Sequence, residues 1–147
     1  MSTRSGDGVA DLPDVNVLVA LYVTSHPHHD AARAWFDRAN SIATTPITQA
    51  GLLCMLMNPV IVDRPRRASA IAAVTDLINT PGVTYWPDLT ANVAQSRFMY
   101  ALTGHRQVTD LHLLDIAAAH GGRLVTFDAK LRAALRKADR WWVMTLD

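Results

Sequence analysis

The sequence predicts a single α/β domain with a central, mostly parallel sheet of about four or five short strands and helices on both faces. Two observations support this fold class. Short apolar runs alternate with longer segments of helical periodicity, and this order is typical of parallel sheets with right-handed crossovers. In addition, the chain has 147 residues, half of them hydrophobic, which is enough for one sizeable core but not for two ordinary domains.

The first third of the chain contains two predicted strands and two predicted helices. Residues 9–13 form a short apolar run, and residues 15–23 stay apolar beyond the usual length of one strand, so we expect a strand-to-helix turn at Asp14. Residues 28–39 carry apolar side chains at helical spacing. Residues 41–45 are then the second predicted strand.

The middle of the chain is expected to be mainly helical. One helix covers residues 48–57, where an Asn-Pro pair interrupts it, and another covers residues 66–79, ending near a Pro-Gly pair. Residues 83–86 are a third short strand. A threonine cap and a following glycine predict a further helix over residues 90–102.

The last third of the chain repeats the alternation of helix and strand. Residues 110–120 are strongly helical and stop at two glycines, and residues 123–127 are a β-rich apolar run. Asp128 opens a predicted helix over residues 129–137. Residues 142–146 form the closing strand.

Charge and cysteine content narrow the class of protein. The formal charge is only +1, from 14 basic and 13 acidic residues, so any contact with RNA must be local. A single cysteine excludes an internal disulfide and suits a reducing compartment. The sequence lacks a secretory signal and any run of roughly 18 apolar residues. We expect a cytoplasmic protein with no membrane segment, in which residues 1–8 are a polar tail and residues 9–147 the folded domain.

Three aspartates lie at predicted junctions between strands and helices. Asp14 follows the first strand, Asp110 precedes a core helix, and Asp128 follows the fourth strand. In open α/β sheets, ligands bind outside the carboxyl ends of the strands, where such side chains converge. Aspartate is also a preferred helix N-cap, and capping explains each residue separately. Capping does not explain why all three occupy junctions that one sheet brings together.

Carboxylates that lie close together predict a bound metal ion. Their charges repel, and a hard divalent cation that prefers oxygen ligands supplies the compensating charge. We expect Mg²⁺, with Mn²⁺ as a possible substitute. Because Mg²⁺ usually keeps several waters and accepts phosphate oxygens, the site favours hydrolysis of phosphodiester bonds over a structural metal.

Three segments contain polar and acidic residues in a recognisable order, namely LPDVNVLVALYVTSHPHH, TTPITQAGLLCMLMNP and VTDLHLLDIAAAHGGRLVTFD. The first resembles the opening motif of PIN-domain ribonucleases, specifically VapC-type toxins of bacterial type II toxin–antitoxin systems. The second resembles their second motif, and the third resembles their third and fourth acidic motifs with the spacing between them. The resemblance runs from about Leu12 to about Leu131. It implies a PIN-like fold, a Mg²⁺-dependent endoribonuclease acting on structured RNA such as tRNA or rRNA, and a cognate antitoxin that blocks the site.

The resemblance also implies roles for individual residues. Gln49 falls where the family usually carries glutamate, and glutamine keeps an acceptor oxygen but loses the charge. The site should therefore hold divalent ions less tightly, and the alternative function is a catalytically impaired RNA- or antitoxin-binding protein. The implied metal ligands are Asp14, Asp110 and Asp128, with Gln49 as a further catalytic position and Asn16, Thr48 and Thr126 as polar supports.

Two further features bear on partners. Lys130 and Arg132 follow Asp128 and are candidates for contacts with RNA phosphates, although such charges usually lie on a solvated face. The segment LLCMLM is richer in leucine and methionine than one buried stripe needs. That surplus fits a homodimer face or a groove for the antitoxin, and burial on two sides produces the same pattern. His112 is expected to be a hydrogen-bonded structural histidine.

Overall fold

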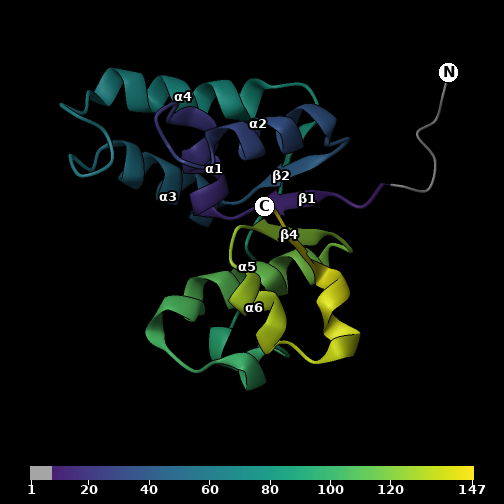
Figure 1. Cartoon of the computed structure of the whole chain (residues 1–147). Helices are drawn as coiled ribbons and strands as arrows, with labels where there is room; N and C mark the ends of the chain where they lie inside the picture. The colour runs from purple at the N-terminus through teal and green to yellow at the C-terminus, as the bar shows by residue number, and fades with distance from the viewer. Residues whose placement is uncertain (1–7) are drawn as a thin grey trace, which may run out of the picture.

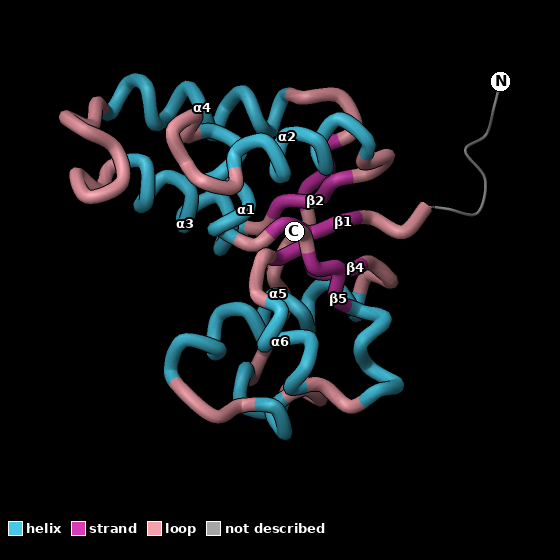
Figure 2. Tube along the Cα trace, in the orientation of Figure 1, coloured by secondary structure: helices cyan, strands magenta, loops and turns pink. Residues whose placement is uncertain are grey.

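A computed structural model describes residues 8–147, which form a parallel five-stranded sheet between two layers of helices (Figures 1 and 2). The strand order is β3-β2-β1-β4-β5. The predicted fold class is therefore confirmed, while residues 1–7 of the predicted polar tail lie outside the described residues. The strands are β1 (Asp11–Pro13), β2 (Ile42–Thr44), β3 (Val83–Tyr85), β4 (Arg123–Thr126) and β5 (Val143–Thr145).

The helices divide between the two faces of the sheet, the first four on one side and the rest on the other (Figure 1). No helix in residues 8–147 is long and apolar enough to cross a lipid bilayer. The first layer contains α1 (Val15–Tyr22), α2 (His29–Arg38), α3 (Pro46–Leu56) and α4 (Arg67–Asn79). The second contains α5 (Val108–Ala119), α6 (Ala129–Ala134) and the short 3₁₀ helices η1 (Val93–Gln95), η2 (Met99–Ala101), η3 (His105–Gln107) and η4 (Lys137–Trp142).

The sheet is buried on both faces because successive strand residues face opposite layers. In β4, Leu124 packs with the cluster that contains the α5 side chains, whereas Val125 packs with α1 and α2. Leu12 of β1 belongs to the α5 cluster, and Ile42 of β2 to the α1–α2 cluster. Strands β1, β2 and β4 therefore lack the polar face of a half-exposed sheet, whereas Thr84 and Tyr85 of the edge strand β3 are exposed.

Two of the three aspartates cap helices, and the third does not. Asp14 is the N-cap of α1, and Asp128 is the N-cap of α6. The helix that contains Asp110 begins earlier than predicted, because η3 leads directly into α5 at Val108. Asp110 is the third residue of α5, so the capping interpretation is wrong for it.

The helix predicted over residues 90–102 is also wrong, since only η1 and η2 form there. The Asn92 side chain accepts a hydrogen bond from the Ala94 N–H at 3.0 Å, and Ser96 Oγ accepts one from the Phe98 N–H at 3.2 Å. Such local bonds compete with the helical hydrogen-bond pattern. Phe98 is fully buried, so the segment satisfies packing without a continuous helix.

The helix predicted over residues 129–137 ends early, at Ala134. Leu135 leaves the helix in an extended conformation, with φ −79° and ψ 149°, and is buried. The chain then continues as η4, whose last residue, Trp142, immediately precedes β5. Burial of one leucine therefore outweighs the helical propensity of the charged residues that follow.

The two glycines after α5 end that helix as predicted and allow β4 to approach β1 closely. Gly121 has φ +68°, and the N–H of Gly122 donates to the carbonyl of the third-last residue of α5, which is a Schellman motif. A Cβ on Gly122 would lie 2.5 Å from the Ala10 carbonyl oxygen and 2.6 Å from the Trp86 ring. That ring stacks on His120 with centroids 4.4 Å apart. A side chain at Gly122 would therefore meet both backbone and a fixed aromatic ring.

Candidate active site

Asp14 is the most firmly held of the three aspartates. It follows β1 at the carboxyl end of the sheet, and its backbone N–H donates to Val125 O at 2.9 Å. Its Oδ1 accepts from the Val17 N–H at 2.9 Å, and its Oδ2 accepts from Thr126 Oγ1 at 2.7 Å. Because the side chain is 2% exposed and both oxygens are bonded, the carboxylate has one fixed orientation.

The hydroxyl of Thr126 connects two of the acidic motifs. It donates to Asp14, 112 residues away in the sequence, and it accepts from the Asp128 N–H at 3.0 Å. Thr126 is fully buried at the end of β4, so this one side chain sets the positions of both aspartates. Thr126 therefore bonds both aspartates, an arrangement compatible with the supporting role that the resemblance implies.

Asp128 and Asp110 keep carboxylate oxygens available. Asp128 is exposed and uses Oδ1 to accept from the N–H groups of Lys130 and Leu131, at 2.9 and 3.3 Å. Asp110 is half-buried in the first turn of α5, and its carboxylate accepts no hydrogen bond from the described residues. Asp128 thus presents one oxygen and Asp110 two without a protein donor.

The charges of the three aspartates act on one another. Burial, together with the negative charges of Asp14 and Asp128, raises the pKa of Asp110 to about 7. Burial also raises the pKa of Asp14, and the hydrogen bonds from Thr126 and Val17 oppose the rise, while Asp128 adds to it. The charges of these three aspartates, which lie far apart in the sequence, therefore interact in the folded chain.

The three aspartates offer a donor set that suits a divalent cation. All three side chains offer oxygen, the donor that Mg²⁺ prefers, and the cation would stabilise the ionised carboxylates against the burial and mutual repulsion that raise the pKa values of Asp14 and Asp110. Within residues 8–147, no group of three or more carboxylate, histidine or cysteine side chains is close enough together to hold a metal ion by itself. Mg²⁺ usually takes one or two carboxylates and completes its shell with water, so the residues present fit this ion.

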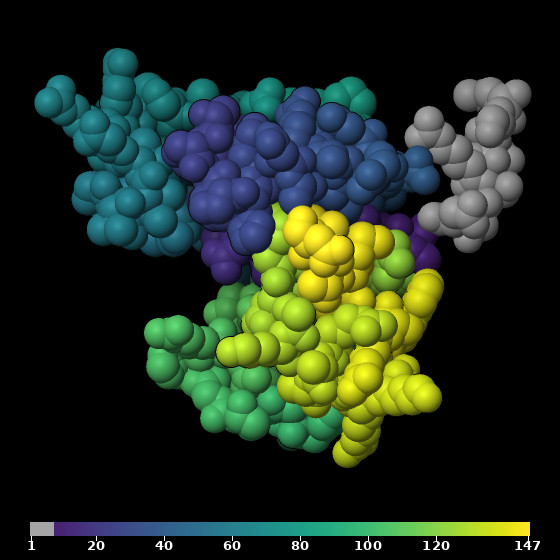
Figure 3. Space-filling model, in the orientation of Figure 1, coloured from purple at the N-terminus to yellow at the C-terminus, as the bar shows by residue number. Residues whose placement is uncertain are grey.

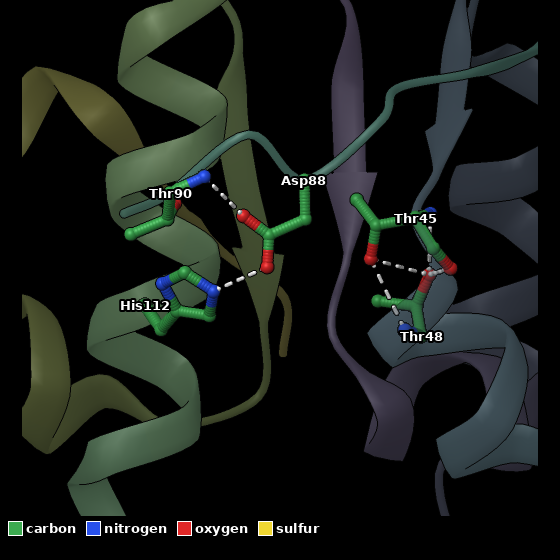
Figure 4. A network of polar contacts seen from close by, with 5 residues as sticks. All are labelled: Thr45, Thr48, Asp88, Thr90 and His112. Carbon is green, nitrogen blue, oxygen red and sulfur yellow. Dashed lines mark hydrogen bonds and ion pairs between the residues drawn. The ribbon is translucent and has the colours of Figure 1, made fainter. Parts of the chain in front are cut away.

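The second motif lies at the end of the neighbouring strand. Gln49, on α3, donates from Nε2 to Thr44 Oγ1 at 3.0 Å, at the end of β2. Thr48 is engaged in a capping box, since Thr45 and Thr48 each accept the other's backbone N–H through their hydroxyls (Figure 4). Thr48 therefore supports α3, and Gln49 keeps its amide oxygen without a hydrogen-bond donor among the described residues.

The remaining predicted residues lie at the margin of the site. Asn16 is exposed on the first turn of α1. Burial raises the pKa of Asp14, and the backbone N–H of Asn16 partly opposes this rise. Lys130 and Arg132 are both exposed on α6, directly after Asp128. The Lys130 backbone N–H bonds Asp128, while neither side chain forms an ion pair with a carboxylate in the described part of the chain.

A family model agrees with this arrangement of strands and acidic residues. The model of the PIN domain matches residues 12–137. The chain belongs to the PIN-domain family. The matched range contains all three aspartates as well as Gln49 and Thr126, so the PIN resemblance inferred from the motifs is confirmed.

Several curated relatives of this PIN domain are ribonucleases of the VapC type from Mycobacterium tuberculosis. Ribonuclease VapC39 is 44% identical over 124 residues, covering 82% of this chain and 89% of the relative. Ribonuclease VapC38 is 40% identical and covers 80% of this chain and 84% of the relative. A solved structure, VapBC2 from Rickettsia felis bound to a promoter DNA fragment, matches with a TM-score of 0.63 and 15% identity, covering 95% of this chain and 100% of that one, which supports the fold.

This PIN domain also contains a polar pair that sequence reasoning missed in part. His112 Nε2 and Asp88 Oδ2 lie 2.7 Å apart, and Asp88 Oδ1 accepts from the Thr90 N–H at 3.0 Å (Figure 4). The pair ties the loop after β3 to α5, two residues beyond Asp110. The hydrogen-bonded role expected for His112 is thus present. Its partner was not foreseen, although an aspartate two residues before a threonine is typical of a local turn.

Proposed function

We propose that this PIN domain is a Mg²⁺-dependent endoribonuclease toxin that hydrolyses phosphodiester bonds in structured RNA, tRNA or rRNA, with Mn²⁺ as a possible substitute. The observation that carries the proposal is the Thr126 hydroxyl, which joins Asp14 to Asp128 at the carboxyl end of the sheet, where both charges contribute to the raised pKa of Asp110. Similarity to the VapC ribonucleases, which extends over four fifths of the chain, supports the reaction class.

The chain's own residues would divide the work of the site between them. Asp14 is fixed by two hydrogen bonds and serves as the oriented ligand, while the unbonded oxygens of Asp110 and Asp128 complete the donor set. When bound, Mg²⁺ supplies polarisation of the scissile phosphate and a lower pKa for the attacking water. Thr126 keeps its proton on Oγ1, directed at Asp14, and so preserves the geometry through the reaction.

A second candidate is a catalytically impaired PIN protein that binds RNA or an antitoxin. It is favoured by one observation, the neutral amide of Gln49 at the position where the family usually carries glutamate. In this structure one N–H of the amide is donated to Thr44, and the amide oxygen accepts no hydrogen bond from the described residues. Gln49→Glu separates the candidates, since a large gain in cleavage supports impairment, and little change supports three aspartates as sufficient.

The primary experiment is cleavage of total tRNA and rRNA by the purified chain. We expect cleavage with Mg²⁺ or Mn²⁺, its loss in excess EDTA, and its loss in Asp14→Asn. Asp115→Asn, a carboxylate elsewhere on α5, is the matched control and should retain activity. Equal cleavage in EDTA would refute the metal mechanism. Sequencing of RNA 5′ ends after brief expression would identify the substrate.

We also infer that a cognate antitoxin blocks the site and that the chain forms a homodimer. The solved VapBC2 pair supports a toxin–antitoxin context. In α3, Leu52 and Leu56 are buried in the core, whereas Cys54 and Met57 are exposed, so burial on two sides explains only part of the apolar surplus. Light scattering of the purified chain tests the dimer, and a monomer at all concentrations would refute it.

A further inference from the structure

We propose that a hollow behind α6 binds one backbone phosphate of the RNA, next to the scissile bond. The hollow has a volume of about 400 Å³. This inference rests on the proposed ribonuclease function, and it adds Arg140 and Thr145 to Arg132, which the sequence had already indicated as a candidate phosphate contact. The lining residues are Ala129, Arg132, Ala133, Arg140 and Thr145.

The two arginines are the first argument for an anion. Neither Arg132 nor Arg140 forms an ion pair with a carboxylate in the described part of the chain, where the ion pairs involve Arg33, His112 and Arg123. Guanidinium groups match phosphate oxygens in geometry and donate in pairs. On a chain with a formal charge of only +1, two unneutralised arginines around one hollow are a local positive site.

Arg140 is held in place before any ligand binds. Its Nε donates to Leu135 O at 3.2 Å, and its Nη2 donates to Ala133 O at 3.3 Å. These acceptors are uncharged, so the guanidinium keeps its full positive charge and has other N–H groups free to donate. A fixed side chain loses less conformational entropy on binding than a mobile one. Arg132, which lies on α6, supplies the second guanidinium group.

Thr145 provides an independent argument from hydrogen bonding. Its Oγ1 is buried and has no hydrogen-bond partner among the described residues. A buried hydroxyl without a partner carries a cost that an incoming acceptor removes. Phosphate oxygens are such acceptors, whereas an apolar ligand would leave the hydroxyl unpaired.

The position of the hollow links it to the acidic site. Thr145 on β5 is the register partner of Thr126 on β4, the residue that bonds Asp14. Arg132 lies four residues after Asp128, and residues at this spacing share one face of a helix. The C-terminal segment forms the front surface of the lower layer (Figure 3). In the proposed arrangement, a strand held at the aspartates extends to the hollow, where the phosphate contact adds affinity without reading bases.

Binding of RNA as a function of salt tests the contact. The probe is a 5′-fluorescein-labelled single-stranded RNA of mixed sequence, measured by anisotropy in an Asp14→Asn background so that it stays intact. The double substitution Arg132→Gln/Arg140→Gln should lower the slope of log K against log salt by about 0.7, the value for one phosphate on a single strand. Thr145→Val should weaken binding about two- to tenfold without changing the slope, because it removes a neutral donor.

The matched control is Arg66→Gln/Arg67→Gln, which removes two charges at the start of α4 in the other layer. The inference is wrong if this control changes the salt slope as much as Arg132→Gln/Arg140→Gln does. It is also wrong if Arg132→Gln and Thr145→Val both bind the RNA as tightly as the Asp14→Asn protein without further substitution. Should Arg140→Gln unfold the chain, the other two variants still decide. Cleavage of total tRNA by the wild type is measured in parallel. If the wild type cleaves tRNA but the double variant leaves the salt slope unchanged, only the proposed phosphate contact is wrong. If the slope changes but the wild type does not cleave, only the proposed nuclease activity is wrong. If the chain does not bind RNA, both proposals are wrong.

Discussion

Asp110→Asn is expected to stabilise the metal-free protein at alkaline pH while abolishing cleavage. Burial, followed by the charges of Asp14 and Asp128, raises the pKa of Asp110 from 3.8 to about 7. The folded state therefore binds this proton more tightly than the unfolded state does. The ionised carboxylate lowers the free energy of unfolding progressively as the pH rises from about 4 to about 7, and by a constant amount above that.

The size of the effect follows from the shift. About three pKa units correspond to a ceiling of ~4 kcal/mol, at 1.36 kcal/mol per unit. Because Asp110 is only partly buried, solvent screening reduces the expected gain to about 1–2 kcal/mol. Asparagine keeps the shape and removes the charge, so the gain should be present near pH 8 and absent near pH 4.

Urea denaturation in EDTA at the two pH values measures this gain. Asp115→Asn makes the same chemical change on α5 and is the matched control. Adding Mg²⁺ near pH 8 should stabilise the wild type, by ~2.7 kcal/mol when Mg²⁺ is at a hundred times its dissociation constant, and should stabilise Asp110→Asn less. If Asp110→Asn is no more stable than the wild type near pH 8, or if its gain is the same near pH 4, the electrostatic reasoning is wrong.

Three other substitutions probe the site and its frame. Thr126→Val leaves Asp14 and the Asp128 N–H without their shared partner, so we expect a loss of about 1–3 kcal/mol in urea melts and weaker cleavage; unchanged values would contradict the bridging role. Gly122→Ala places a methyl group against the β1 backbone and should cost about 1–3 kcal/mol, seen as a lower melting temperature. Trp35→Phe removes the indole N–H that donates to buried Asp11, 2.8 Å away, and should lower the free energy of unfolding by about 1–3 kcal/mol. The kcat of the folded protein should stay unchanged, because Asp11 lies at the end of β1 opposite to Asp14.

The placement of the site was predictable because it depends on topology. Apolar runs that end in aspartate locate Asp14 and Asp128, and parallel pairing of β1 with β4 brings the two together. The register also explains why Thr126 reaches Asp14. These features depend on hydrophobic pattern and strand order, both of which are visible in the sequence.

The parts that were not predictable depend on contacts between distant residues. Asp110 lies in the first turn of α5 because η3 continues directly into the helix at Val108. No local sequence pattern predicts this junction. The segment at 90–102 lost its helix to side-chain bonds at Asn92 and Ser96 and to the burial of Phe98. The pair of Asp88 and His112 requires the loop after β3 to cross α5, which only the folded chain shows.

The hydroxyl of Thr126 has a consequence for the timing of activity during synthesis. Asp14 leaves the ribosome early, yet its orienting partner follows 112 residues later, and Asp128 comes later still. Contacts of such long range form only when the intervening chain has closed on itself. A growing chain therefore has no assembled acidic site while its first layer of helices folds, and the site is completed only when β4 joins the sheet.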